Sequence, residues 1–153
     1  MCLGNIVRSP LAENLFLRQV EQAGITDRFE VDSAGTGAWH IGEPPDSRMR
    51  RVAASHGLKY NGRARQIQPD DLQNFDLIIA MDRENQADLQ RFFRSPEVDR
   101  KIRLLREFDP FGGPGAGVPD PYYGGIDGFE EVYQIVERST KNLLDAILSG
   151  KLE

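Results

Sequence analysis

Residues 2–10 read Cys-Leu-Gly-Asn-Ile-Val-Arg-Ser-Pro, and this stretch joins the only cysteine of the chain to the start of a predicted helix. Ser9 and Pro10 are typical of a helix N-terminus, with Ser as the N-cap and Pro at the first helical position. Gly24 is expected to end this helix, whose apolar face is formed by Leu11, Leu15, Phe16 and Val20. The stretch therefore predicts a loop that runs directly into an amphipathic helix.

The rest of the chain alternates between extended and helical patterns. Extended segments are expected at residues 29–33, 76–81 and 102–105, and helices at residues 46–57, 84–93 and 129–148. Residues 76–81 are nearly all apolar, as is typical of a strand buried on both faces. Strands separated by helices predict a three-layer α/β fold with a short parallel sheet and helices on both faces. In such folds ligands bind outside the carboxyl ends of the strands.

The composition is that of an ordinary globular protein. With 153 residues, of which 39% are hydrophobic, we expect one domain over residues 1–153. The net charge of -5 argues against a nucleic-acid partner. No segment has the pattern of a membrane span or a secretory signal, so we expect a cytoplasmic protein without membrane insertion. Because there is one cysteine, Cys2 cannot form an internal disulfide or a multi-cysteine metal site, and we expect it to act as a thiol.

The residues between Cys2 and Arg8 are suited to binding an oxyanion. Successive backbone N–H groups of such a loop point at one anion, and the dipole of the following helix adds positive potential there. Gly4 lets the backbone approach a ligand closely, and Asn5 tolerates a left-handed conformation. The planar guanidinium of Arg8 can bind two phosphate oxygens. The predicted phosphate-binding residues are Leu3, Gly4, Asn5, Ile6, Val7 and Arg8, with Cys2 beneath the phosphorus as a nucleophilic thiolate.

The pattern becomes specific only when its parts are taken together. A Cys-x5-Arg spacing also arises by chance, and a lone cysteine is more often a small buried apolar side chain. With its Gly-Asn and Ser-Pro pairs, however, the stretch resembles the phosphate-binding loop of the low-molecular-weight protein tyrosine phosphatases, Cys-x-Gly-Asn-x-Cys-Arg-Ser-Pro. The resemblance extends over essentially the whole chain, through residues 32–36 (Asp-Ser-Ala-Gly-Thr), Trp39, residues 64–66 (Ala-Arg-Gln), Met81-Asp82 and residues 120–124 (Asp-Pro-Tyr-Tyr-Gly).

The resemblance implies that Cys2 attacks phosphorus and that Asp120 is the general acid. A phosphoester oxygen leaves poorly unless it is protonated, so an acid must face the nucleophile across the phosphoryl group. Taken alone, an Asp-Pro pair is a common turn sequence. In the implied mechanism Asp120 then activates the water that hydrolyses the phosphocysteine. Ser9 would donate a hydrogen bond to the thiolate, while Asn5 and Ser33 would support the loop.

The resemblance also implies an apolar slot for a phenyl ring, with walls formed by Ile6, Trp39, Tyr122 and Tyr123. Any of these could instead be an ordinary core or surface residue. The implied function is hydrolysis of protein phosphotyrosine and aryl phosphates, with inorganic phosphate as product or inhibitor. The expected partners are phosphotyrosine-containing proteins, and neither a metal nor another cofactor is implied.

Three other functions are compatible with parts of the pattern. A protein arginine phosphatase of the same family has Thr at the position of Ile6 and Phe at the position of Tyr122. Arsenate reduction on the same fold needs further cysteines, which this chain lacks. A protein that binds phosphate or phosphotyrosine without turnover is the alternative from a different class, and it stays open because the strand that precedes the cysteine in the family is missing from this sequence.

Three positions depart from the family pattern. Val7 replaces the second loop cysteine, and Gly62 stands where some members have a His that supports the loop. The four-stranded sheet of the family begins with a hydrophobic strand that leads into the cysteine, whereas only Met1 precedes Cys2 in this chain. A central strand pairs with a neighbour on each side. We therefore expect either an apolar strand upstream of this sequence, which we favour, or a sheet that is rearranged or completed by another chain.

Overall fold

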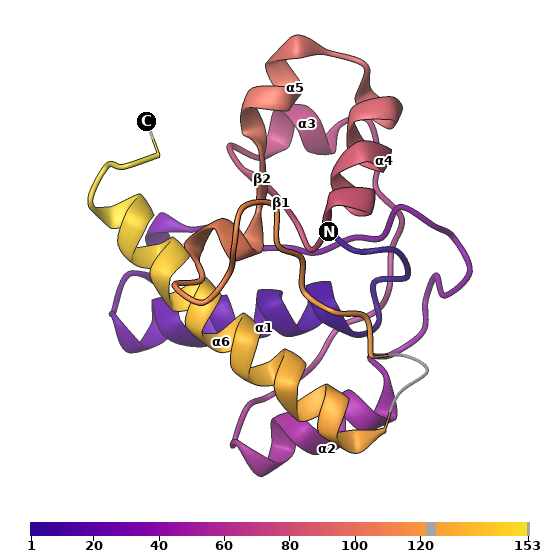
Figure 1. The fold of residues 1–153 in the computed structure, drawn as a ribbon, viewed down its shortest axis with the longest axis vertical. Coiled ribbons are helices and arrows are strands. Elements are labelled where there is room, and N and C mark those ends of the chain that lie inside the picture. The colour runs from indigo at the N-terminus through magenta and orange to yellow at the C-terminus, as the bar shows by residue number, and fades with distance from the viewer. Residues whose placement is uncertain (122–124, 153) are drawn as a thin grey trace.

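The computed structural model describes residues 1–121 and 125–152, and a short parallel sheet lies between two groups of helices (Figure 1). On one side lie α1 (Arg8–Gln22), α2 (Ser47–Ser55) and the long α6 (Ile126–Leu148). On the other side lie α3 (Asp71–Asn74), α4 (Arg83–Phe93) and α5 (Pro96–Lys101). The strands are β1 (Ile78–Ala80) and β2 (Ile102–Leu104), and the short 3-10 helices are η1 (Thr26–Arg28) and η2 (Leu105–Phe108). The predicted α/β class with a parallel sheet is confirmed.

The first two residues of the chain lie in the middle of the sheet. β1 pairs in parallel with β2, with Ile79 opposite Arg103. On the other edge of β1, the Met1 nitrogen donates to the Ile79 carbonyl oxygen at 2.6 Å and the Met81 nitrogen donates to the Met1 carbonyl oxygen at 3.1 Å. Isolated parallel bridges then join Cys2 to Gly35 and Gly35 to Gln66. Cys2 is therefore fixed between two neighbouring segments at the carboxyl end of the sheet.

The predicted strand at residues 29–33 does not form. Phe29 has an extended backbone, but among the described residues no backbone–backbone hydrogen bond involves residues 30–33. The other two predicted strands are shorter than expected, at Ile78–Ala80 and Ile102–Leu104. Among residues 1–121 and 125–152, Met1 and Cys2 are the residues that pair with β1 on one side and with Gly35 on the other.

The predicted helices form with small shifts of their ends. The apolar face of α1 is buried as expected, and it packs on α6. The side chain of Asp46 caps α2 by accepting from the Arg48 nitrogen, and Gly24 follows α1 with a φ of 73°, a left-handed conformation that glycine adopts readily. The prediction of Ser9 as N-cap is wrong, because α1 begins at Arg8 and Ser9 lies inside its first turn.

The length and hydropathy of the helices show whether one of them could cross a membrane. Across the part of the chain that the structure describes, no helix is both long and apolar enough to cross a membrane.

Candidate active site

A pocket of about 420 Å³ lies where the loop after Cys2 runs into α1. It is lined by Cys2, Leu3, Gly4, Ile6, Val7, Arg8, Trp39, His40 and Asp120. The three predicted catalytic side chains therefore meet in one place, although Asp120 is more than a hundred residues from the other two in sequence. The pocket lies at the carboxyl end of the sheet, beside the bridge between Cys2 and Gly35.

The loop wraps around the cysteine sulfur. Asn5 has a φ of 57°, and this left-handed turn lets its backbone nitrogen donate to the Cys2 Sγ atom at 3.3 Å. Gly4 lies under the ring of His40, since a Cβ on Gly4 would lie 2.9 Å from the His40 Cδ2 atom. At Gly35 an added Cβ would lie 2.7 Å from the Leu3 carbonyl oxygen, so only glycine lets this neighbouring segment approach the loop.

Ser9 is the hydroxyl partner of the nucleophile. The Cys2 Sγ atom lies 3.0 Å from Ser9 Oγ, and Cys2 is only 3% exposed. Ser9 Oγ also accepts from Asn5 Nδ2 at 2.8 Å, which leaves the serine proton available for the sulfur. A buried thiolate at this position would receive hydrogen bonds from both the Ser9 hydroxyl and the Asn5 backbone nitrogen.

Asn5 also connects the loop to the rest of the molecule. Its Nδ2 atom donates to Ser33 Oγ at 2.9 Å, and its Oδ1 atom accepts from the Arg65 backbone nitrogen at 3.0 Å. Ser33 Oγ in turn donates to Glu13 Oε1 at 2.5 Å. Burial raises the pKa of the Glu13 carboxyl, while its hydrogen bond from Ser33 acts in the opposite direction. Asn5 and Ser33 thus lie where a support for the loop is needed.

Two acceptors fix the position of the Arg8 guanidinium. Arg8 is 4% exposed, and its Nη1 atom donates to Asp82 Oδ2 at 2.6 Å and to the Val118 carbonyl oxygen at 3.0 Å. Asp82 is the N-cap of α4, where its Oδ1 atom accepts from the Asn85 nitrogen at 2.7 Å. Fixed in this way, the guanidinium presents its other nitrogen to the pocket.

Asp120 faces Arg8 from the late loop. Its Oδ2 atom lies 3.6 Å from Arg8 Nη2, and its side chain is 49% exposed. The Val118 nitrogen donates to the Met81 carbonyl oxygen at 2.7 Å, which attaches this loop to the end of β1. A half-exposed carboxyl group therefore lines the same pocket as Cys2 and lies beside the Arg8 guanidinium.

Two of the four predicted wall residues are in place. Ile6 and Trp39 line the pocket, and Trp39 is 72% exposed, so it stands at the rim. Its ring lies against Gly37, where an added Cβ would overlap the indole. Tyr122 and Tyr123 lie outside the described residues.

Several supporting residues were not identified from the sequence. Asp82, Glu13 and Tyr60 all contact the loop or its partners, and the Tyr60 hydroxyl donates to the Val7 carbonyl oxygen at 2.8 Å. Burial and the nearby Cys2 raise the pKa of Tyr60 well above its ordinary value, so the hydroxyl stays a donor. Asp82 had a usable signal, since an Asp directly after a buried strand and before a helix is a natural N-cap. Tyr60 had none.

The chemistry of the site rests on the thiol of Cys2. In the described ranges, residues 1–121 and 125–152, no group of three or more His, Cys, Asp or Glu side chains is arranged to hold a metal ion.

Comparisons with known proteins identify a family to which this chain is similar. Residues 1–151 match the family model described as low molecular weight phosphotyrosine protein phosphatase. A low molecular weight protein-tyrosine-phosphatase of Streptomyces coelicolor is 45% identical over 148 residues, covering 96% of this chain and 90% of that protein. A low molecular weight phosphotyrosine protein phosphatase of Schizosaccharomyces pombe is 44% identical over 151 residues, covering 96% and 94%.

The fold is also shared with solved structures. A protein tyrosine phosphatase of Entamoeba histolytica, crystallised with Hepes in its active site, has a TM-score of 0.92 to this chain at 38% identity. The comparison covers 98% of this chain and 95% of that one. The likeness therefore includes both layers of helices and the sheet between them.

Proposed function

This chain belongs to the low molecular weight phosphotyrosine protein phosphatase family, whose activity is cysteine-dependent hydrolysis of phosphotyrosine, and we propose that Cys2, Arg8 and Asp120 carry out that reaction in it. The observation that supports this assignment is the convergence of the three side chains in one pocket, where Asp120 Oδ2 lies 3.6 Å from Arg8 Nη2 and Cys2 is nearly buried. We also propose that residues 1–153 act as one catalytic domain.

Substrate binding depends on the loop and on Arg8. Backbone N–H groups of residues 3–7 and the start of α1 surround the phosphate, while the Nη2 atom of the Arg8 guanidinium binds its outer oxygens. Arg8 is already tethered to Asp82 and Val118, so little side-chain entropy is lost when phosphate binds. Inorganic phosphate, the product, occupies the same position and acts as an inhibitor.

The first chemical step transfers the phosphoryl group to Cys2. The thiolate attacks phosphorus in line, the S–P bond forms and the P–O bond to the tyrosine oxygen breaks. Asp120 gives its proton to that oxygen, so the product leaves as neutral tyrosine. Hydrogen bonds from Ser9 and Asn5 hold the thiolate before attack and stabilise it again when it leaves.

The second step returns the enzyme to its starting state. The Asp120 carboxylate removes a proton from a water molecule, whose oxygen attacks phosphorus. The S–P bond breaks, inorganic phosphate is released and Cys2 is again a thiolate. The proton that Asp120 takes from water replaces the one that it gave to the tyrosine oxygen, so Asp120 is ready to donate again in the next cycle.

Ile6 and Trp39 select the aromatic leaving group. A phenyl ring that enters between them places the phosphate at the depth of Cys2, whereas the short side chain of phosphoserine does not reach it with the same contacts. Phosphotyrosine-containing proteins are accordingly the substrates that we propose. The cytoplasm, where thiols stay reduced, suits an enzyme that depends on one unpaired cysteine.

A steady-state assay with a phosphotyrosine peptide tests the assignment. Cys2→Ser is expected to lose turnover while it still binds phosphate, because the loop and Arg8 remain and a hydroxyl is a far weaker nucleophile at neutral pH. Cys2→Ser with the turnover of the unaltered enzyme would contradict it. Arg8→Ala is expected to lose phosphate binding. Arg63→Ala, which removes the same side chain at an exposed position, is the matched control and should still bind phosphate.

A further inference from the structure

Neighbouring segments bind the backbone carbonyl groups of the phosphate-binding loop. In the first half of the loop, the Thr36 nitrogen donates to the Cys2 carbonyl oxygen at 3.0 Å. The Gly37 nitrogen donates to the Leu3 carbonyl oxygen at 2.9 Å. Both donors are backbone groups, so this part of the support follows from the path of the chain and does not depend on a particular side chain.

The second half of the loop is supported by a side chain. The Tyr60 hydroxyl lies 2.8 Å from the Val7 carbonyl oxygen and 3.3 Å from the Ile6 carbonyl oxygen, and it donates its one proton to this pair. The Asp46 nitrogen also donates to the Ile6 oxygen at 2.8 Å, and the Leu11 nitrogen donates to the Val7 oxygen at 3.3 Å. Because burial raises the pKa of Tyr60 well above its ordinary value, the hydroxyl keeps its proton at neutral pH.

The directions of these carbonyl groups determine the directions of the N–H groups of the loop. Within one trans peptide, the C=O of a residue and the N–H of the next residue point in opposite directions. Tyr60 is 7% exposed and packs in the core, so the Ile6 and Val7 carbonyl groups that it binds point away from the open pocket. The N–H groups of Val7 and Arg8 therefore point toward the pocket.

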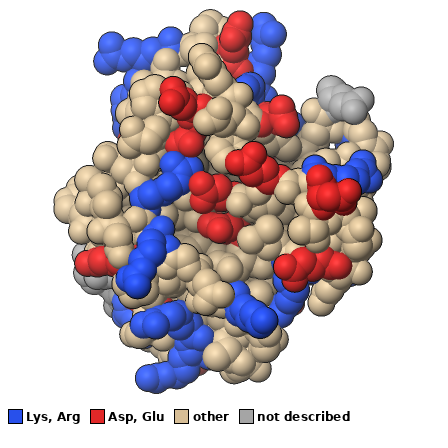
Figure 2. Space-filling model, turned by 180° about the vertical axis from the view of Figure 1, so that it is seen from behind, with Lys and Arg blue, Asp and Glu red and all other residues tan. Residues whose placement is uncertain are grey.

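The direction of these N–H groups matters because the charge of the whole molecule does not attract an anion. The net charge is -5, and acidic side chains gather near the middle of the face seen in Figure 2. Attraction of a phosphate must therefore come from donors close to it, which are the Arg8 guanidinium, the start of α1 and the N–H groups of the loop. Such donors stabilise charge most strongly when they are already oriented before the reaction.

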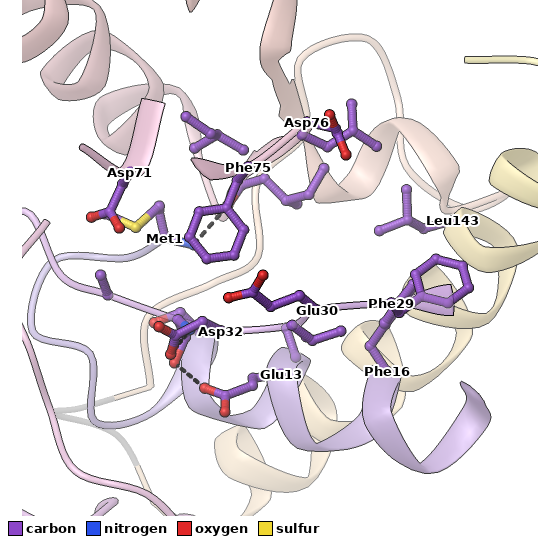
Figure 3. Close-up of a pocket in the computed structure, with 18 of the residues that line it drawn as sticks. Met1, Glu13, Phe16, Phe29, Glu30, Asp32, Asp71, Phe75, Asp76 and Leu143 are labelled. Carbon is purple, nitrogen blue, oxygen red and sulfur yellow. Dashed lines mark hydrogen bonds between the residues drawn. The ribbon is translucent and has the colours of Figure 1, made fainter. Parts of the chain in front are cut away.

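The Asn5 side chain supports a different part of the loop. Its Nδ2 atom donates to Ser33, and the dashed line at Glu13 in Figure 3 marks the hydrogen bond that Ser33 donates to Glu13. These bonds end on the side chain of Asn5, whereas the bonds of Tyr60 end on the main chain of residues 6–7. Tyr60 therefore supports the loop independently of the contacts from Ser33 and Glu13.

We propose that Tyr60 is a positioning residue of the active site, whose hydroxyl directs the N–H groups of Val7 and Arg8 at the phosphoryl oxygens. It does so through the carbonyl groups of Ile6 and Val7, from within the core and without contact to the substrate. The inference rests on the proposed function, because it assigns these two N–H groups to the phosphoryl group that Cys2 attacks. Orientation of the loop would then depend on one phenolic hydroxyl.

Phosphate binding by Tyr60→Phe tests the proposal, since this change removes one hydroxyl and keeps the ring in the core. The variant is expected to bind inorganic phosphate about three- to tenfold more weakly in calorimetry, because N–H groups that lose their direction form weaker hydrogen bonds to the anion. In amide NMR spectra at saturating phosphate, the signals of Val7 and Arg8 should shift less than in the unaltered protein. The signals of Leu3 and Gly4 should shift as before, because backbone donors hold the carbonyl groups that precede them.

Tyr133→Phe is the matched control. Tyr133 of α6 is also buried, and its hydroxyl accepts from Arg18 at 3.0 Å and donates to Glu137 at 3.2 Å. The change therefore removes a tyrosine hydroxyl of the same kind at a position away from the loop. Both variants should lose some thermal stability, but Tyr133→Phe should bind phosphate as the unaltered protein does.

Three outcomes would overturn the proposal. One is unchanged phosphate binding in Tyr60→Phe. The second is an equal loss of binding in Tyr60→Phe and Tyr133→Phe, which would show a general effect of stability. The third is a change spread evenly over the amide signals of residues 3–8. A failure of the proposed function has a different result, namely no hydrolysis of a phosphotyrosine peptide by the unaltered protein, and the phosphate measurement does not need turnover.

Discussion

The Sγ atom of Cys2 lies 3.0 Å from the Oγ atom of Ser9, and the two side chains come from either end of the phosphate-binding loop. Ser9 reaches the sulfur because it lies inside the first turn of α1 and not at its N-cap. One hydroxyl therefore links the nucleophile to the helix whose positive end faces the pocket.

Removing this hydroxyl should lower catalysis without unfolding the protein. Ser9→Ala is expected to lower kcat/KM by about 10- to 100-fold, since a hydrogen bond to a charged group contributes about 1.5–3 kcal/mol. The readout is steady-state hydrolysis of an aryl phosphate, with the melting temperature measured in parallel. Ser55→Ala removes a serine hydroxyl that donates to the Val52 carbonyl within α2, and it should leave kcat/KM unchanged. Equal activity of the two variants would remove Ser9 from the mechanism.

Asp82 should act through Arg8 and not on the substrate directly. Asp82→Ala frees the Arg8 guanidinium from a 2.6 Å contact, so we expect weaker phosphate binding and a higher KM. The variant also loses an N-cap, which costs about 0.5–2 kcal/mol of stability. Asp46→Ala separates the two effects, because Asp46 caps α2 in the same way and its side chain binds Arg48 instead of Arg8. We expect lower stability in both variants but weaker phosphate binding only in Asp82→Ala.

Trp39 should contribute to the preference for aryl phosphates. Trp39→Ala is expected to lower kcat/KM for phosphotyrosine relative to phosphoserine, because one apolar contact contributes about 1–3 kcal/mol to discrimination. Phe111→Ala is the matched control, since Phe111 is 77% exposed and does not line the pocket. A preference that is the same in both variants would show that Trp39 is an ordinary surface residue.

Stability should fall in acid because of Asp109. Burial raises the pKa of this carboxyl, but hydrogen bonds from Arg138, the Phe111 nitrogen and Arg106 outweigh it and hold the pKa below its ordinary value. A folded pKa below the unfolded value of about 3.9 gives stability that is present above about pH 4 and is lost as pH falls through the folded pKa.

Urea unfolding of Asp109→Asn at two pH values checks this sign. At pH 7 the variant should be less stable by about 1–3 kcal/mol, the usual cost of weakening hydrogen bonds to a buried charged group whose partners are partly exposed. At pH 3 the difference from the unaltered protein should be smaller. Asp88→Asn, which removes a more exposed ion pair with Arg91, should change stability by less than about 1 kcal/mol at either pH. A difference for Asp109→Asn that grows in acid would contradict the assignment of this pH dependence to the Asp109 ion pairs.

Local sequence signals predicted the elements that depend on local interactions. The apolar spacing of α1, the Asp46 cap of α2 and the left-handed Gly24 each depend on residues within one or two turns. The pairing of residues 29–33 was predicted wrongly, because a strand needs a neighbour that is distant in sequence, and only Met1 and Cys2 lie in that position. β-propensity describes the segment and not the availability of its partner.

The same distinction applies to the candidate site. The loop from Cys2 to Arg8 is contiguous, so its spacing could be interpreted directly. The supports of Arg8 and Val7 come from Asp82 and Tyr60, and the chain folds back to bring them there. Their roles depend on tertiary contacts, which the spacing of residues in the sequence does not indicate.

The most direct test of the central claim is to locate the phosphoryl group during turnover. The enzyme is mixed with a phosphotyrosine substrate, denatured rapidly and analysed by peptide mass spectrometry, with Asp120→Asn included to slow hydrolysis of the intermediate. We predict a phosphate on the sulfur of Cys2 in both proteins, and none in Cys2→Ser. Turnover at the normal rate with phosphate on another residue, or in Cys2→Ser, would contradict the assignment of Cys2 as the nucleophile.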